Sequence, residues 1–246
     1  MSASSSTAPM EHISIASLSH LPSRVQYLRT FIGFTDEDAA ALHAAAPVVA
    51  PLVPTVVDAV YTKLLSFDIT AKAFVPRQTG FTGEATAKLE DLSLEHPHVK
   101  FRKDFLGQYL VKVVSMDYDK DETWEYLDKV GLMHTGVAGF AHRKKKPALR
   151  VELVHCAILL GYVEDILANA VLNHPDLDLA TKTAVLRAVN KILWIQNDLF
   201  ARHYVRDAEL EERQVRIERT SAAAAAFGIF ALGVGFARYV APLWRK

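Results

Sequence analysis

The stretch Trp124-Glu125-Tyr126-Leu127-Asp128-Lys129-Val130-Gly131-Leu132-Met133-His134 decides the fold that we predict for this chain. Trp124, Leu127, Gly131 and His134 fall at the spacing that lines one face of an α-helix. A glycine one turn before the histidine would let a flat group approach closely, and an imidazole at that point suits an axial ligand of haem iron. From spacing alone, a core histidine hydrogen-bonded to a carbonyl is the commoner alternative.

The composition of the 246 residues excludes several classes of protein. Half of the residues are hydrophobic, which excludes a disordered chain. Lys plus Arg and Asp plus Glu balance at 28 each, so we expect no nucleic-acid partner. The single cysteine, Cys156, excludes an intrachain disulfide and fits a reducing compartment. Residues 1–20 are rich in Ser and Ala and lack a signal-peptide pattern, which predicts a disordered lead and an intracellular protein.

The remaining pattern is helical throughout, and no segment alternates with period two for long enough to form a strand. We predict an all-α protein in which Pro47, Pro51 and Pro54 interrupt the chain between two early helices. A short helical piece is expected near residues 85–94, and a loop at 135–146. The main predicted helices cover residues 22–32, 35–46, 56–67, 99–115, 122–134, 147–172 and a last long stretch from about 179.

The composition of the sequence changes twice in the C-terminal part of the chain. Residues 205–219 form a charged run with both signs balanced, for which a solvated helical face or a helical stalk is expected. Ser221 to Ala237 carries no charge, and Trp244, Arg245 and Lys246 follow. Residues 220–246 therefore predict a tail anchor that enters a membrane through residues 221–244. The alternative is an apolar helix packed within the protein or against a partner.

Residues 22–204 resemble the protoglobin and globin-coupled sensor family. Val130-Gly131-Leu132-Met133-His134 matches the Gly-x-x-His element of that family's proximal helix, and the residues from Arg102-Lys103-Asp104-Phe105 to Tyr118 resemble the helix before it. Val56-Val57-Asp58-Ala59-Val60-Tyr61, with Lys63 to Asp68 after it, resembles the distal helix. The resemblance implies a globin-like helical sandwich over residues 21–204 that binds haem, followed by the stalk and the apolar tail helix.

The resemblance also assigns roles to single residues. His134 takes the place of the proximal metal ligand, with Gly131 beside the cofactor. Tyr61 takes the place of the distal tyrosine that would hydrogen-bond a gas ligand, and Phe105 that of the bulky distal aromatic. Without the resemblance, Tyr61 and Phe105 would be plain core aromatics. His96, His98 and His155 compete for the metal only if His134 is not the ligand. The family often pairs through its last two long helices, so a homodimer is expected.

The function implied is reversible binding of a diatomic gas (O2, CO or NO) by a sensor or gas-binding protein at a membrane, rather than by an enzyme. The tail would lie in an organelle membrane, with the globin domain facing the cytosol. One alternative is haem chemistry on NO, nitrite or peroxide with an external reductant, because no Gly-x-Gly-x-x-Gly nucleotide fingerprint is present. The other is a haem-free, tail-anchored helical adapter. Fold alone does not choose among the three.

Overall fold

The computed structural model describes residues 10–76, 81–83, 88–137 and 150–205. It divides the chain into two compact units, residues 1–201 and 202–246. Of the second unit only residues 202–205 are described, and they are helical. The tail anchor predicted at 220–246, and all of the stalk predicted at 205–219 except its first residue, lie outside the described residues. The predicted domain boundaries therefore stay predictions.

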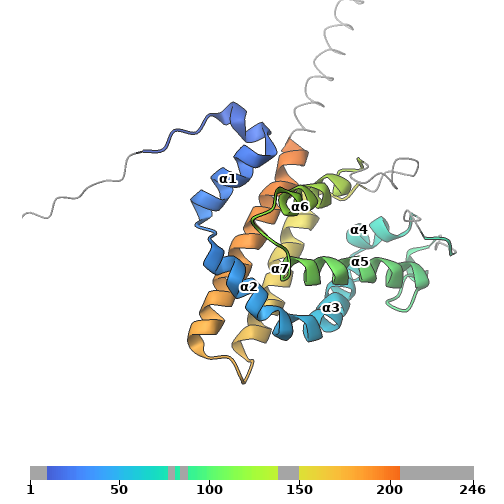
Figure 1. The fold of residues 1–246 in the computed structure, drawn as a ribbon. Coiled ribbons are helices and arrows are strands. Elements are labelled where there is room, and N and C mark those ends of the chain that lie inside the picture. Colours follow the sequence, from blue (N-terminus) through green and yellow to red (C-terminus); the bar gives the residue numbers. More distant parts are fainter. Residues whose placement is uncertain (1–9, 77–80, 84–87, 138–149, 206–246) are drawn as a thin grey trace, which may run out of the picture. The chain divides into compact units, whose positions relative to one another are not determined.

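The regular structure of the described residues is helical (Figure 1), which confirms the predicted all-α class. In those ranges the one extended pairing is an isolated β-bridge between Thr135 and Arg150. Short 3-10 helices lie at Ile15–Ser19, Ala50–Leu52, Lys72–Phe74 and Leu89–Asp91. The α-helices are α1 (Leu21–Ile32), α2 (Asp36–Val49), α3 (Val53–Leu65), α4 (Asp68–Ala71), α5 (Pro97–Val113), α6 (Asp121–His134), α7 (Leu153–Leu172) and a helix over residues 179–205, named here the 179–205 helix.

Pro47, Pro51 and Pro54 do not break the helical path as expected. Pro47 lies inside α2, which continues to Val49. Ala50–Leu52 then forms a 3-10 turn with Pro51 near its start, and Pro54 lies in the first turn of α3. The first N–H groups of a helix have no partner within it, so a proline there loses no hydrogen bond. The chain therefore stays helical where the sequence predicted an interruption.

Several predicted helix ends are also wrong. α3 ends at Leu65, and Phe67, which was expected in its apolar stripe, precedes α4 and is exposed. α7 begins at Leu153 rather than at Pro147, because Arg150 pairs with Thr135 and residues 151–152 are not helical. Pro147 itself lies outside the described residues. Within the predicted disordered lead, residues 15–19 form a 3-10 helix.

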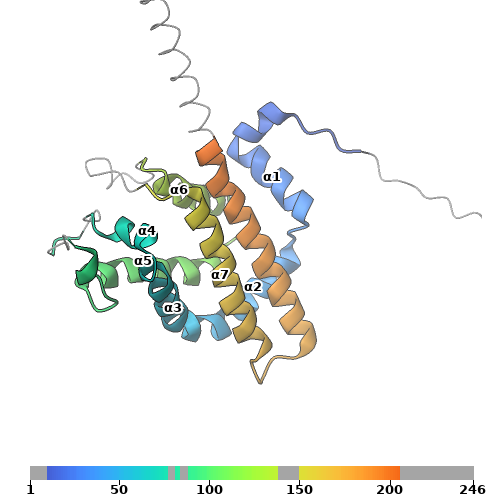
Figure 2. The ribbon, with the colours of Figure 1, turned by 180° about the vertical axis from the view of Figure 1, so that it is seen from behind.

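Two pairs of helices form the frame of the first unit. α7 and the 179–205 helix lie side by side and antiparallel (Figures 1 and 2), joined through residues 173–178. α3 packs against α5, where a Cβ on Gly107 would lie 3.5 Å from a methyl carbon of Val53. Glycine therefore allows the two helix backbones to approach closely at this point.

Two ion pairs attach the N-terminal helices to the 179–205 helix. Arg24 of α1 binds both carboxylate oxygens of Asp198, at 2.5 and 2.7 Å. Lys191 Nζ lies 2.7 Å from the nearer carboxylate oxygen of Asp38 and donates to the carbonyl of Gly33 as well. Burial opposes ionisation of Asp38, but the hydrogen bonds from Lys191 and Thr35 outweigh it and hold the pKa of that carboxyl below its usual range.

Candidate functional site

His134 lies at the C-terminal end of α6, the helix that the opening motif predicted. Asp121 and Glu122 lie in the first turn of α6, where carboxylates interact favourably with the positive end of the helix dipole. Trp124, Leu127 and Gly131 are buried. The predicted apolar face of this helix is therefore confirmed, and packing of that face fixes the rotation of α6 about its axis.

One hydrogen bond determines the state of the His134 ring. Its Nδ1 lies 2.7 Å from the backbone carbonyl oxygen of Val130, one turn earlier in α6. A carbonyl oxygen can only accept, so Nδ1 carries the proton and donates it. In the neutral imidazole the lone pair is then on Nε2. This is the tautomer that a histidine needs to bind a metal through Nε2 while a backbone acceptor holds its other nitrogen.

Two further contacts hold His134 in place. The ring of Phe200 in the 179–205 helix meets the imidazole edge to face, with centroids 5.1 Å apart and an interplanar angle of 83°. The backbone N–H of Val151 donates to the carbonyl of His134 at 2.8 Å, next to the bridge between Thr135 and Arg150. The chain after α6 thus returns to the end of the helix and pairs with it.

Tyr61 is buried in α3, as a distal-pocket residue would be. Its ring packs against Phe74, with centroids 5.5 Å apart, and its hydroxyl forms no hydrogen bond with another described residue. Burial raises the pKa of Tyr61 well above its usual value; the Arg102 guanidinium opposes this shift and the Asp104 carboxylate adds to it. The hydroxyl therefore stays protonated and keeps its ability to donate a hydrogen bond.

Arg102 contacts the residues that pack beside Tyr61, a role that was not predicted from the sequence. From α5 it donates to the backbone carbonyls of Ala73 and Pro76, at 2.9 and 3.0 Å, and its guanidinium lies 4.8 Å from the centroid of the Phe74 ring. It thereby ties the segment after α4 to α5 and fixes the ring that contacts Tyr61. A basic residue in a helix does not reveal such a contact, because both acceptors are backbone groups distant in sequence.

Phe105 is 45 % exposed and packs edge to face against Phe101, with centroids 5.1 Å apart. Apolar residues recur every fourth position in α5, at Phe101, Phe105, Tyr109 and Val113, but of these only Val113 is fully buried. Residues four apart drift by about 40° around a helix, so a long row of this spacing winds away from one face. The distal role of Phe105 stays a prediction.

The competing histidines have other structural roles. His96 caps the N-terminus of α5, and its Nδ1 accepts from the backbone N–H of His98 at 3.2 Å. His98 is completely buried and stacks on Phe81, with centroids 4.8 Å apart. His155 lies in the first turn of α7, 3.9 Å from Glu152.

A comparison with protein families decides the family of this chain. The family model described as Protoglobin matches residues 21–210. The chain belongs to the protoglobin family. That match confirms the resemblance seen over residues 22–204 of the sequence.

A comparison with solved structures gives a protein of similar fold. The globin domain of the Geobacter sulfurreducens globin-coupled sensor superposes with a TM-score of 0.54 at 22 % sequence identity, and the match covers 73 % of this chain and 96 % of that domain. This likeness confirms the globin-like fold. A search of curated proteins gives no match to this protoglobin.

Replacement of Tyr61 by Phe tests the burial of its hydroxyl. Above pH 10 the unfolded chain loses the Tyr61 proton while the folded chain keeps it, so the free energy of unfolding falls by about 1.4 kcal/mol per pH unit for each such tyrosine. In urea unfolding between pH 8 and 11.5, Tyr61→Phe should make the fall in the free energy of unfolding with pH less steep, by the contribution of one proton. Stability at pH 8 should change little, because no hydrogen bond is lost.

Tyr118→Phe is the matched control. Tyr118 is also buried with a raised pKa, but its hydroxyl donates to the Val113 carbonyl at 2.5 Å. This variant should flatten the alkaline slope and also lose about 1 kcal/mol or more at pH 8. An unchanged slope in Tyr61→Phe would contradict the buried, protonated state of Tyr61.

Proposed function

We propose that this protoglobin binds haem through His134 and reversibly binds a diatomic gas, as a sensor or gas-binding protein. The observation that carries the proposal is the hydrogen bond from His134 Nδ1 to the Val130 carbonyl, which leaves the lone pair on Nε2. When bound, the haem iron would supply the coordination position for the gas. Membership of a globin family supports this function as well.

The residues around His134 fit an axial ligand. The acceptor of the Nδ1 proton is a backbone carbonyl, which is uncharged and does not take up that proton as a carboxylate could. The edge of Phe200 limits rotation of the ring about its Cβ–Cγ bond. Gly131, buried one turn before His134, adds no side chain to this face of α6. The chain thus offers one oriented imidazole.

Tyr61 fits a donor to the gas. A protonated hydroxyl that lacks a described hydrogen-bond partner can donate to a polar ligand without first losing another bond. Such a bond stabilises the bound gas by about 1 kcal/mol, which corresponds to several-fold in affinity. Phe105 would restrict access on the same α3–α5 side of the protein.

Absorption spectroscopy of the purified chain with added haem tests the proposal. Wild type should show a Soret band that shifts when CO is added to the reduced protein. His134→Gly should lose the five-coordinate spectrum and regain a similar one with added imidazole, which replaces the missing side chain. His155→Ala, a partly buried histidine of α7, should behave as wild type.

Two results would contradict haem ligation by His134. A wild-type chain without a Soret band would favour the haem-free adapter. A His134→Gly spectrum identical to wild type would assign the metal to another ligand.

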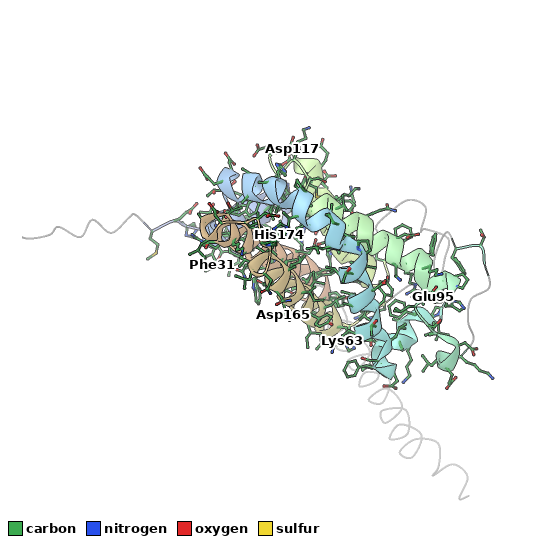
Figure 3. The ribbon with its side chains drawn as sticks, turned by 90° about the horizontal axis from the view of Figure 1, so that it is seen from below. Phe31, Lys63, Glu95, Asp117, Asp165 and His174 are labelled. Atoms are coloured by element: carbon green, nitrogen blue, oxygen red, sulfur yellow. The ribbon has the colours of Figure 1, made fainter. Side chains whose placement is uncertain are left out.

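We further propose that the protein is a homodimer that pairs through α7 and the 179–205 helix. Val154, Ile158, Gly161 and Leu172 are exposed along one side of α7, and Ile158 is 70 % exposed. Asp165 projects from the same outer side (Figure 3). No heavy atom outside α7's own backbone and neighbouring residues lies within 4 Å of a Cβ built on Gly161. Exposed apolar side chains gathered on one helix mark a surface for association.

Light scattering coupled to size exclusion tests this pairing. Wild type should have the mass of two chains, and Ile158→Asp combined with Trp194→Asp should have the mass of one. Trp194 is the exposed tryptophan of the neighbouring helix. The control is Phe31→Asp, which changes an exposed aromatic of α1 and should leave a dimer. A monomeric wild type would contradict the pairing.

We also propose that residues 221–244 anchor the chain in an organelle membrane, with the globin domain in the cytosol. The uncharged run from Ser221 to Ala237 supports this location, as does the basic end of the chain. Among the described residues, Asp36–Leu65 and Leu153–Leu172 are long and apolar enough to cross a membrane. Both contribute buried side chains to the packed body, such as Val56 and Val163, so they support a span only weakly.

Flotation of the full chain with liposomes tests the anchor. Wild type should float, and Ile229→Asp combined with Leu232→Asp should remain at the bottom of the gradient, because charges are costly in the bilayer. Ala208→Asp adds one charge to the charged run and should still float. A wild-type chain that stays at the bottom would contradict the anchor.

A further inference from the structure

Gln196 is a polar residue in the buried face of the 179–205 helix. It is 0 % exposed, and Ile192, Ile195 and Leu199 around it are buried as well. A buried amide without hydrogen-bond partners costs free energy, so a glutamine in such a place needs specific partners. The described structure provides two of them, from two other helices.

The amide of Gln196 joins α5, α6 and the 179–205 helix. The hydroxyl of Tyr109 in α5 lies 3.1 Å from Oε1, and Nε2 lies 3.1 Å from the Leu127 carbonyl oxygen in α6. The carbonyl can only accept, so the amide must present its N–H groups to Leu127 and its oxygen to Tyr109. The tyrosine then donates. Burial raises the pKa of Tyr109 far above its usual value, which keeps this donor protonated.

The Leu127 carbonyl can accept two hydrogen bonds. In an α-helix the carbonyl of residue 127 accepts from the N–H of residue 131, and its second lone pair can accept from Gln196 Nε2. Gly131 is buried one turn after Leu127 and adds no side chain to this part of α6.

The same helix touches His134 one turn further along. Phe200 follows Gln196 by four residues, and its ring packs on the imidazole. The 179–205 helix therefore meets α6 at two points, the Leu127 carbonyl and the His134 ring. Val130, whose carbonyl orients that ring, lies between them in α6. Two points separated along both helices fix the rotation and the axial register of α6.

We propose that Gln196 is a positioning residue for the proximal histidine. By binding Leu127 and Tyr109 it fixes α6 against the 179–205 helix and α5, and so sets the direction in which His134 Nε2 points. This inference rests on the proposed function in one respect, namely that His134 ligates haem iron. It adds a residue that would touch neither haem nor gas and that acts through the position of α6, the helix that carries the metal-binding imidazole.

The first measurement uses the chain without haem. Gln196→Met keeps the length of the side chain and removes both hydrogen bonds, whereas Tyr109→Phe removes one. The two substitutions are combined in a double-mutant cycle measured by urea unfolding. Gln196→Met should raise the equilibrium constant for unfolding roughly tenfold or more. Tyr109→Phe should add little in the Gln196→Met background. Additive effects of the two substitutions would overturn the bridge.

The second measurement uses the haem-loaded chain. The iron–histidine stretching frequency of the reduced, CO-free protein, recorded by resonance Raman scattering, should shift in Gln196→Met, and the rate of CO rebinding should change with it. Asn190→Leu is the matched control, because Asn190 lies in the same helix and its exposed amide binds Glu164 of α7 at 2.7 Å. Its frequency should equal that of wild type.

The outcomes separate this inference from the proposed function. An unchanged iron–histidine frequency in a haem-loaded Gln196→Met protein would overturn the positioning role and leave haem binding intact. A wild-type chain without a Soret band would overturn haem binding, and the positioning of a metal ligand with it. A frequency shift that appears equally in Asn190→Leu would assign the effect to general loosening of the helix and would also overturn the specific role of Gln196.

Discussion

The hydrogen bond from His134 Nδ1 to the Val130 carbonyl is the interaction on which the functional account of this protoglobin depends. In the neutral ring it places the proton on one nitrogen and the lone pair on the other, and it ties the ring to the backbone of α6. A backbone acceptor one turn back in the same helix makes this orientation local. The rest of the fold then needs only to hold α6 in place, and the buried contacts of Trp124, Leu127 and Gln196 do so.

Local helix chemistry explains which parts of the fold could be predicted from sequence. The buried face of α6 and the end of α1 at Gly33, whose φ is 69°, follow from spacing and from a left-handed cap. Pro51 and Pro54 misled the prediction because a proline in the first turn of a helix loses no hydrogen bond, whereas Pro47 lies inside α2, where a proline does remove one. The late start of α7 depends on the pairing of Arg150 with Thr135, and the local sequence gives no sign of that pairing.

The candidate site likewise contains residues that a local motif predicts and residues that depend on contacts between helices. His134 and Gly131 belong to one short motif on one helix, so their spacing and the resemblance to a family suffice to predict them as site residues. Arg102, Phe200 and Gln196 come from other helices and act on backbone groups or rings distant in sequence, which a pattern along the chain does not reveal. Of these three, Gln196 is the one that the sequence could have indicated, because it is a polar residue among isoleucines and leucines of the same helix that are buried. Such a residue is a reason to look for polar partners across helices.

The 179–205 helix is the common element of the first unit. It binds α1 through Asp198 and the start of α2 through Lys191, and it contacts α6 through Gln196 and Phe200. A change in the position of His134 would therefore reach a helix that also holds the N-terminal helices. Transmission of ligation along this helix requires two conformations that bind the gas with different affinity.

Proton NMR of the reduced, CO-free chain with haem tests the orientation of His134 most directly. The account predicts one strongly shifted resonance from an imidazole N–H that exchanges in D2O, assigned to Nδ1 of His134 by its loss in His134→Gly with imidazole omitted. A haem-loaded wild-type protein without that resonance, or one that keeps it after the substitution, would contradict the account.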